Sequence, residues 1–128
     1  MRKALQKIYG SFEGKLVGNV KMKRYVCETL EKMPEEIISS ITKNCWFFAS
    51  LEDAWAFTFT GSDLRKQHLI FLSDDLLLQN PGKIYYTIAH EIGHVVLGHR
   101  NSVLEKQTRE EIKRQEQEAD QFAKQFDF

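Results

Sequence analysis

Several features that define other classes of protein are missing from this chain of 128 residues. It has only two cysteines, Cys27 and Cys45, which form neither a CxxC pair nor a disulfide framework. It has no run of 18 apolar residues, and no apolar segment follows its basic N-terminus, as a secretory signal would require. Lys and Arg number 18, as do Asp and Glu, so there is no basic surplus. These absences predict a cytoplasmic protein with no membrane partner and no direct nucleic-acid binding.

The composition that remains is that of a folded protein. Hydrophobic residues make up 42% of the chain and charged residues 28%, and the length suits a single domain over residues 1–128. Residues 1–43 are expected to be helical. The segment from Lys21 to Lys32 has apolar residues at helical spacing, and Pro34 suits the first turn of a helix over Glu35 to Ile41.

Residues 44–128 are expected to hold a small sheet followed by the helices of the site. Cys45 to Ala49 and Ala54 to Thr60 are rich in aromatic residues, and the few residues between them predict a hairpin. A third strand is expected at His68 to Leu72. Helices follow, the longest over Lys83 to Leu97 and Leu104 to Phe126. This order predicts an α+β domain with a three-stranded antiparallel sheet.

The sequence His90-Glu91-Ile92-Gly93-His94 is an HExxH motif within the predicted helix over Lys83 to Leu97. Residues four apart on a helix lie about 40° apart around its axis, so both imidazoles point the same way. Two such imidazoles supply half of a tetrahedral zinc (Zn²⁺) site. Glu91 then reaches the same cleft, where it can act as the general base on water.

A zinc peptidase needs a third protein ligand, and Glu116 on the last predicted helix is the best candidate. Asp120 is four residues further on and shares its face, so it can accept an N–H from a ligand histidine and fix its tautomer. Glu118 lies about 200° round the helix from Glu116, which argues against it as a ligand. His99 follows Gly98, beyond the end of the motif helix, and is interpreted as a surface or packing histidine.

Two segments together resemble the ImmA/IrrE family of metallo-endopeptidases: AHEIGHVVLGHR, from Ala89 to Arg100, and EQEADQFAKQF, from Glu116 to Phe126. The resemblance covers roughly residues 83–126. It implies a minimal zincin-like fold, and a zinc-dependent endopeptidase in which His90, His94, Glu91 and Glu116 have the roles argued above. It also implies a protein substrate, such as a helix-turn-helix transcriptional repressor.

Further site residues are expected on the strand and on the motif helix. The strand at His68 to Leu72 stands where the family has its edge strand, so a substrate would add to it by main-chain hydrogen bonds, beside His68, Ile70 and Leu72. Tyr86 lies one turn before His90 on the same face and is the candidate electrophile; His68 is an alternative for that role.

Other functions remain open at this point. The chain is similar in size to the minigluzincins, minimal scaffolds that can be made latent by an N-terminal segment or by oligomerisation. A latent or inactive protein with a structural metal, acting as a binding or regulatory module or as a homo-oligomer, is therefore an alternative. A metal-free helical interaction module is another. Glu91 favours the enzyme, because a purely structural metal site has no need of a glutamate at that position.

Overall fold

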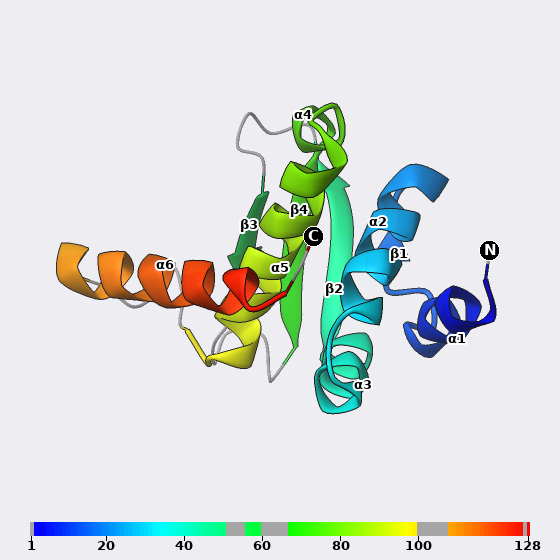
Figure 1. Ribbon diagram of the computed structural model, residues 1–128, viewed down its shortest axis with the longest axis horizontal. Helices are drawn as coiled ribbons and strands as arrows, with labels where there is room; N and C mark the ends of the chain where they lie inside the picture. The colour runs from blue at the N-terminus through cyan, green and yellow to red at the C-terminus, as the bar shows by residue number, and fades with distance from the viewer. Residues whose placement is uncertain (1, 51–55, 60–66, 100–107, 127) are drawn as a thin grey trace.

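The computed structural model describes residues 2–50, 56–59, 67–99, 108–126 and 128, and shows helices packed against a mixed β-sheet (Figure 1). The elements in chain order are α1 (Lys3–Ser11), β1 (Leu16–Val17), α2 (Val20–Glu31), α3 (Glu35–Asn44), β2 (Cys45–Ser50), β3 (Ala56–Phe59), β4 (His68–Ser73), α4 (Asp74–Leu77), α5 (Pro81–Val96) and α6 (Arg109–Lys124). The described residues thus combine helices and strands, as the sequence led us to expect.

The N-terminal helices begin at recognisable local signals. The side chain of Asn19 accepts a hydrogen bond from the amide of Met22 and so caps α2. Pro34 is the N-cap of α3, and two glutamates follow in its first turn, where the helix dipole favours negative charge. The predicted helices are therefore present. The two-residue strand β1 was not expected, because so short a segment shows no alternation of apolar and polar residues.

The sheet differs from the expected three-stranded antiparallel arrangement. Within the described residues it has four strands in the order β1-β2-β4-β3. Strand β2 pairs in parallel with both β1 and β4, and only β3 runs antiparallel, next to β4. The predicted hairpin between the first two aromatic strands is therefore wrong, since β4 lies between β2 and β3. Its expected turn, from Leu51 to Asp53, lies outside the described residues.

Burial explains this strand order. β4 reads His-Leu-Ile-Phe-Leu-Ser, an apolar run without alternation, which is typical of a strand whose two faces are both covered, as inner strands commonly are. β3 reads Ala-Phe-Thr-Phe, which alternates as edge strands commonly do. The strand that needs the most burial therefore takes the inner position, even though it comes last along the chain.

The core lies between the sheet and the helices α2 and α5, which contact each other (Figure 1). On the other face of the sheet, the half-buried rings of Trp46, Phe48 and Phe71 stack in a row. The fully buried apolar side chains of the core include Met22, Val26 and Leu30 of α2, Phe47 of β2, Ile70 and Leu72 of β4, and Ile84, Ile88 and Ile92 of α5. α5 therefore has one face fixed in the core, which makes it a rigid support for the residues on its other face.

Both cysteines are free thiols with no exposed surface. Burial raises the pKa of Cys27 to about 11, with Glu28 adding to the effect. Burial also raises the pKa of Cys45 to about 12, partly offset by Lys15. Because the thiolate is the reactive form, we expect iodoacetamide at pH 8 to alkylate the folded chain roughly 100-fold more slowly than the urea-unfolded chain. Cys27→Ala and Cys45→Ala variants would assign the rate to each thiol, and a folded-state rate equal to the unfolded one would contradict the burial.

Among the described residues, no helix is both long enough and apolar enough to cross a membrane.

Candidate metal centre

The helix that carries the motif begins and ends at clear signals. Asn80 caps α5 by accepting a hydrogen bond from the amide of Lys83, and Pro81 occupies its first turn. Gly98 follows the last turn with a φ of 70°, the left-handed conformation that glycine adopts most easily. The helix predicted over Lys83 to Leu97 is therefore confirmed, with its start two residues earlier.

The structure brings together the three residues predicted to bind metal. One ligand atom from each of His90, His94 and Glu116 lies within 4.8 Å of the others. Nε2 of His90 and Nε2 of His94 are 3.2 Å apart. The two carboxylate oxygens of Glu116 lie 2.9 Å from Nε2 of His90 and 3.2 Å from Nε2 of His94. These atoms converge on one point from two helices.

These distances fit a zinc ion. Tetrahedral ligands at about 2.0–2.2 Å from zinc lie about 3.3–3.6 Å from one another, a few tenths of an ångström more than the separations of 2.9 and 3.2 Å observed here. The donor set of two imidazoles and a carboxylate is also one that zinc takes in catalytic sites. The described residues therefore include a cluster that could hold a metal ion, and its chemistry matches zinc.

Helix α6 supplies Glu116 because it crosses α5 at close range (Figure 1). Ala119 and Ala123 of α6 are fully buried, and Phe122 is nearly so. A Cβ atom at Gly93, inside the motif, would lie only 2.9 Å from the ring of Phe122. The small residues on both helices thus permit the close crossing that brings Glu116 to the histidines. The expected start of this helix at Leu104 lies outside the described residues, and α6 begins at Arg109 with Thr108 as its cap.

Asp120 has the role predicted for it. Its carboxylate oxygen Oδ1 lies 2.8 Å from Nδ1 of His90. Since a carboxylate only accepts, this contact favours a proton on Nδ1 of His90, which leaves the lone pair of Nε2 for a metal ion. Asp120 therefore favours the tautomer of His90 that binds metal.

Tyr86 also donates to Asp120, and this changes its interpretation. Its hydroxyl lies 2.9 Å from the same oxygen of Asp120 that His90 contacts. Burial and the hydrogen bond to Asp120 raise the pKa of Tyr86 to about 12. The hydroxyl proton is therefore engaged with Asp120 instead of facing a substrate. The structure therefore supports a role for Tyr86 in holding the carboxylate of Asp120. It gives less support to the electrophile role that was expected from the sequence.

Glu91 lies beside the cluster without being part of it. Its Oε2 is 4.0 Å from Nε2 of His94, and the residue is 5% exposed. Burial lowers the pKa of His94 to about 4; Glu116 opposes this, while His90 and His99 add to it. A neutral His94 is the form that binds a metal, and the adjacent carboxylate of Glu91 is placed to accept a proton from water near the metal.

The expected substrate strand is wrong. β4, from His68 to Ser73, pairs along its whole length with β2 and over Leu69 to Leu72 with β3. Its main-chain groups are therefore already hydrogen-bonded on both sides, and no substrate can add to it. Ile70 and Leu72 are fully buried in the core, so their side chains are not at a binding surface either. The edge of the sheet on this side is β3.

His68, the alternative electrophile, is not brought to the cluster by any hydrogen bond or ion pair within the described part of the chain. Burial lowers its pKa, and its Nδ1 is buried without a hydrogen-bond partner among those residues. We find no support in the geometry for a catalytic role of His68.

One residue near the cluster was missed by the sequence interpretation. His99 is 7% exposed, and its Nδ1 lies 2.9 Å from Nδ1 of His94. It is therefore neither a surface histidine nor one that only fills space. The signal that could have found it is Gly98, because a glycine at that position turns the chain back over the last helical turn.

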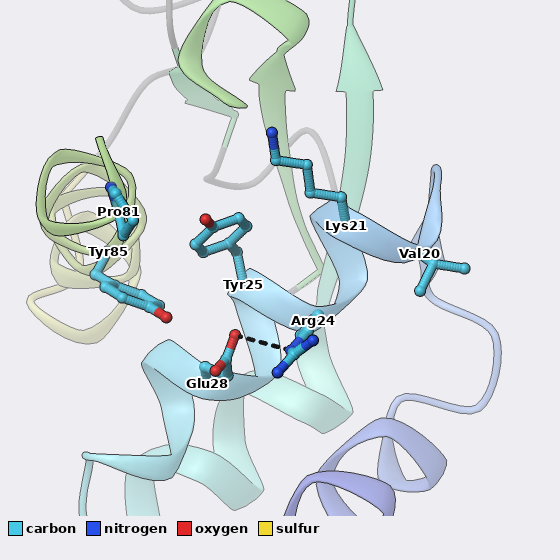
Figure 2. Close-up of a pocket in the computed structure, with 7 residues that line it drawn as sticks. All are labelled: Val20, Lys21, Arg24, Tyr25, Glu28, Pro81 and Tyr85. Carbon is cyan, nitrogen blue, oxygen red and sulfur yellow. Dashed lines mark ion pairs between the residues drawn. The ribbon is translucent and has the colours of Figure 1, made fainter. Parts of the chain in front are cut away.

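A separate pocket lies at the other end of α5 (Figure 2). It is lined by residues of α2 and the start of α5, among them Tyr25 and Tyr85, whose ring centroids are 5.2 Å apart. An ion pair between Arg24 and Glu28 borders it, with 3.5 Å between the charged atoms. None of the residues that line it belongs to the metal cluster.

The site as a whole combines two histidines and a glutamate on one helix with a carboxylate from a second helix, and this cluster could hold a metal ion. The sequence model of the family Peptidase U49 matches residues 82–127, which is less than half of the chain but contains the whole cluster. This similarity supports a peptidase, without supporting the ImmA/IrrE family specifically. No curated protein matches the chain. No solved structure does so either.

Proposed function

We propose that this protein is a zinc-dependent endopeptidase with a minimal zincin-like fold. The single observation that carries the proposal is the convergence of His90, His94 and Glu116, with Glu91 at its side. The similarity of residues 82–127 to Peptidase U49 supports the hydrolysis of peptide bonds. A cytosolic protein is the proposed substrate, with a helix-turn-helix repressor as the example that the resemblance to ImmA/IrrE suggests.

The roles of the residues follow from their chemistry. His90, His94 and Glu116 would hold the metal, which when bound supplies Lewis acidity that polarises a carbonyl group and lowers the pKa of water. Glu91 would accept a proton from the attacking water and pass it to the leaving amine. Asp120, by accepting the Nδ1 proton of His90, would leave Nε2 available to the metal.

The substrate is proposed to add to β3 instead of β4. Within the described residues, β3 is hydrogen-bonded only to β4, and it lies beside α5, which carries the motif. An extended peptide paired with this edge would run past the cluster and expose its main-chain carbonyls to it.

The proposal is tested by metal content and hydrolysis together. We expect the purified wild-type chain to hold about one zinc per chain and to cleave fluorescein-labelled casein, with the activity lost to 1,10-phenanthroline and restored by added zinc. Glu116→Ala should weaken zinc binding by more than the ~10–100-fold typical of losing a group that only hydrogen-bonds a ligand. Glu110→Ala, an exposed change on the same helix, is the matched control.

Two results would count against this function. The proposed metal site is contradicted if the wild-type chain is metal-free after gentle purification. It is also contradicted if the Glu116→Ala variant binds zinc as tightly as wild type. A chain that binds zinc but cleaves no protein or peptide would instead support the latent, minigluzincin-like alternative.

A further inference from the structure

The end of α5 folds the chain back over a metal-binding histidine. The amide of Gly98 donates to the carbonyl of Val95 at 3.1 Å, and the amide of His99 donates to the carbonyl of His94 at 2.9 Å. With the φ of 70° at Gly98, these bonds make a Schellman motif. This motif commonly brings the residue after the glycine into contact with the third residue from the helix end. Here those two residues are His99 and His94.

The two imidazoles meet through their Nδ1 atoms, which are 2.9 Å apart. At this distance one nitrogen must donate a proton and the other must accept it. If His94 donates, its Nε2 keeps a lone pair directed at the cluster. If His99 donates, the neutral His94 carries its own proton on Nε2, which points at the cluster and prevents metal binding. The direction of this one hydrogen bond therefore decides whether His94 is a ligand.

Glu118 of α6 favours the productive direction. Its Oε1 lies 3.3 Å from Nε2 of His99, although the angle is not that of a hydrogen bond. A carboxylate attracts a protonated Nε2 and repels a lone pair at that distance. The Nε2 proton on His99 leaves its Nδ1 as an acceptor and so favours His94 as the donor, in competition with Glu116, whose Oε1 lies 3.2 Å from Nε2 of His94 and attracts the proton to that nitrogen.

We propose that His99, oriented by Glu118, is a positioning residue that holds His94 in the tautomer competent to bind metal. The arrangement parallels the one in which Asp120 fixes His90. In both, a polar group from beyond the cluster accepts the Nδ1 proton, and Nε2 is left for the metal. Each ligand histidine thus has its own partner, Asp120 on α6 for one and His99 after α5 for the other. The inference rests on the proposed function only in that it needs the metal site, and it makes no assumption about the substrate.

Zinc affinity of the metal-free chain, measured by competition with a chromophoric chelator, tests the proposal. We expect His99→Leu to weaken binding by roughly 10–100-fold. A leucine suits this position of a Schellman motif, so the helix end should be kept. His99→Gln restores an acceptor for the Nδ1 proton and should recover most of the affinity. Glu118→Gln should weaken binding in the same direction but by less, while Glu110→Gln, the control, should not.

A second readout separates tautomer control from packing. Chains labelled with ¹⁵N-histidine report which ring nitrogen of His94 is protonated in the absence of metal. Glu116, whose Oε1 lies 3.2 Å from Nε2 of His94, competes for the proton in the metal-free chain, so we expect a larger fraction of the Nδ1–H form in wild type and in His99→Gln than in His99→Leu. Circular dichroism of each variant verifies the fold. If His99→Leu does not fold, the proposal is tested with Glu118→Gln, which changes an exposed side chain.

The outcomes distinguish this inference from the proposed function. Zinc affinity unchanged in His99→Leu, or lost equally in His99→Gln, would overturn the role of His99 alone. A wild-type chain that binds no zinc would overturn the proposed function and this inference with it. If the wild-type chain binds zinc without cleaving protein, and the variants rank as expected in zinc affinity, the role of His99 is supported. The proposed endopeptidase activity is then contradicted.

Discussion

Glu91→Gln is expected to abolish hydrolysis while zinc binding remains at the wild-type level. Glutamine has the same shape as glutamate but cannot accept a proton from water, and a general base commonly contributes ~10²–10⁴-fold to the rate. Glu91 is outside the cluster of ligand atoms, so its replacement should leave the metal in place. Its side chain is 7% exposed, and a neutral amide is easier to bury than a carboxylate, so the fold should tolerate the change.

The measurement is kcat/KM on a fluorogenic peptide, alongside zinc stoichiometry by elemental analysis. Glu36→Gln, at an exposed position in the first turn of α3, is the matched control and should cleave like wild type. Full activity in Glu91→Gln would mean that another group takes the proton. Loss of zinc from this variant would instead make Glu91 a ligand, against the geometry described here.

The helices and the metal cluster could be predicted because their causes are local. The two histidines share a face through their spacing alone, and Glu116 and Asp120 share one for the same reason. Caps such as Ser73, which accepts a hydrogen bond from the amide of Leu76, are also read from neighbouring residues. The start of α5 was placed two residues late because the prediction began at Lys83, although Asn80 is the cap and Pro81 belongs to the first turn.

The sheet could not be predicted in this way, because its order is set by contacts distant in sequence. Phe47 of β2 lies beside Ile70 of β4, and the sequence around either residue does not predict this pairing. The adjacency of two aromatic segments favoured a hairpin, but burial of β4 on both sides decided the order. The substrate edge was misplaced as a direct consequence.

The contacts among polar side chains follow a similar division. Asp120 was assigned correctly because its partner, His90, was already known from the motif. Tyr86 was expected to face the substrate because its position on the face of the motif helix was known. The position of α6, which places Asp120 within hydrogen-bond distance of the Tyr86 hydroxyl, was not known. His99 was correctly placed beyond the end of the motif helix, but the turn at Gly98 that brings it to His94 was not recognised. In each case the residue was identifiable and its partner depended on tertiary structure.

The close approach of α6 to α5 makes Gly93 the position where a change of size should most affect the metal site without touching a ligand. A Cβ there would lie 2.9 Å from Cδ1 and 3.2 Å from Cβ of Phe122. The Cβ of Phe122 is fixed to the backbone of α6, so the helix itself must move. We expect Gly93→Leu to lower the free energy of unfolding by about 1–3 kcal/mol through overpacking, net of the ~1 kcal/mol that leucine gains over glycine in helix propensity.

The same displacement should weaken zinc binding on the order of 10-fold or more, because Glu116 travels with α6 and a site tolerates only about 0.5 Å of misplacement. Gly10→Leu is the matched control, since nothing lies within 4 Å of a Cβ at that helical glycine, and it should be neutral or stabilising. Adding Phe122→Ala to Gly93→Leu should cost less stability than the two single changes summed, by about 0.5–3 kcal/mol. Additive losses in urea unfolding would show that the two residues do not compete for one space. Wild-type zinc affinity in Gly93→Leu would show that Glu116 reaches the cluster without help from this helix crossing.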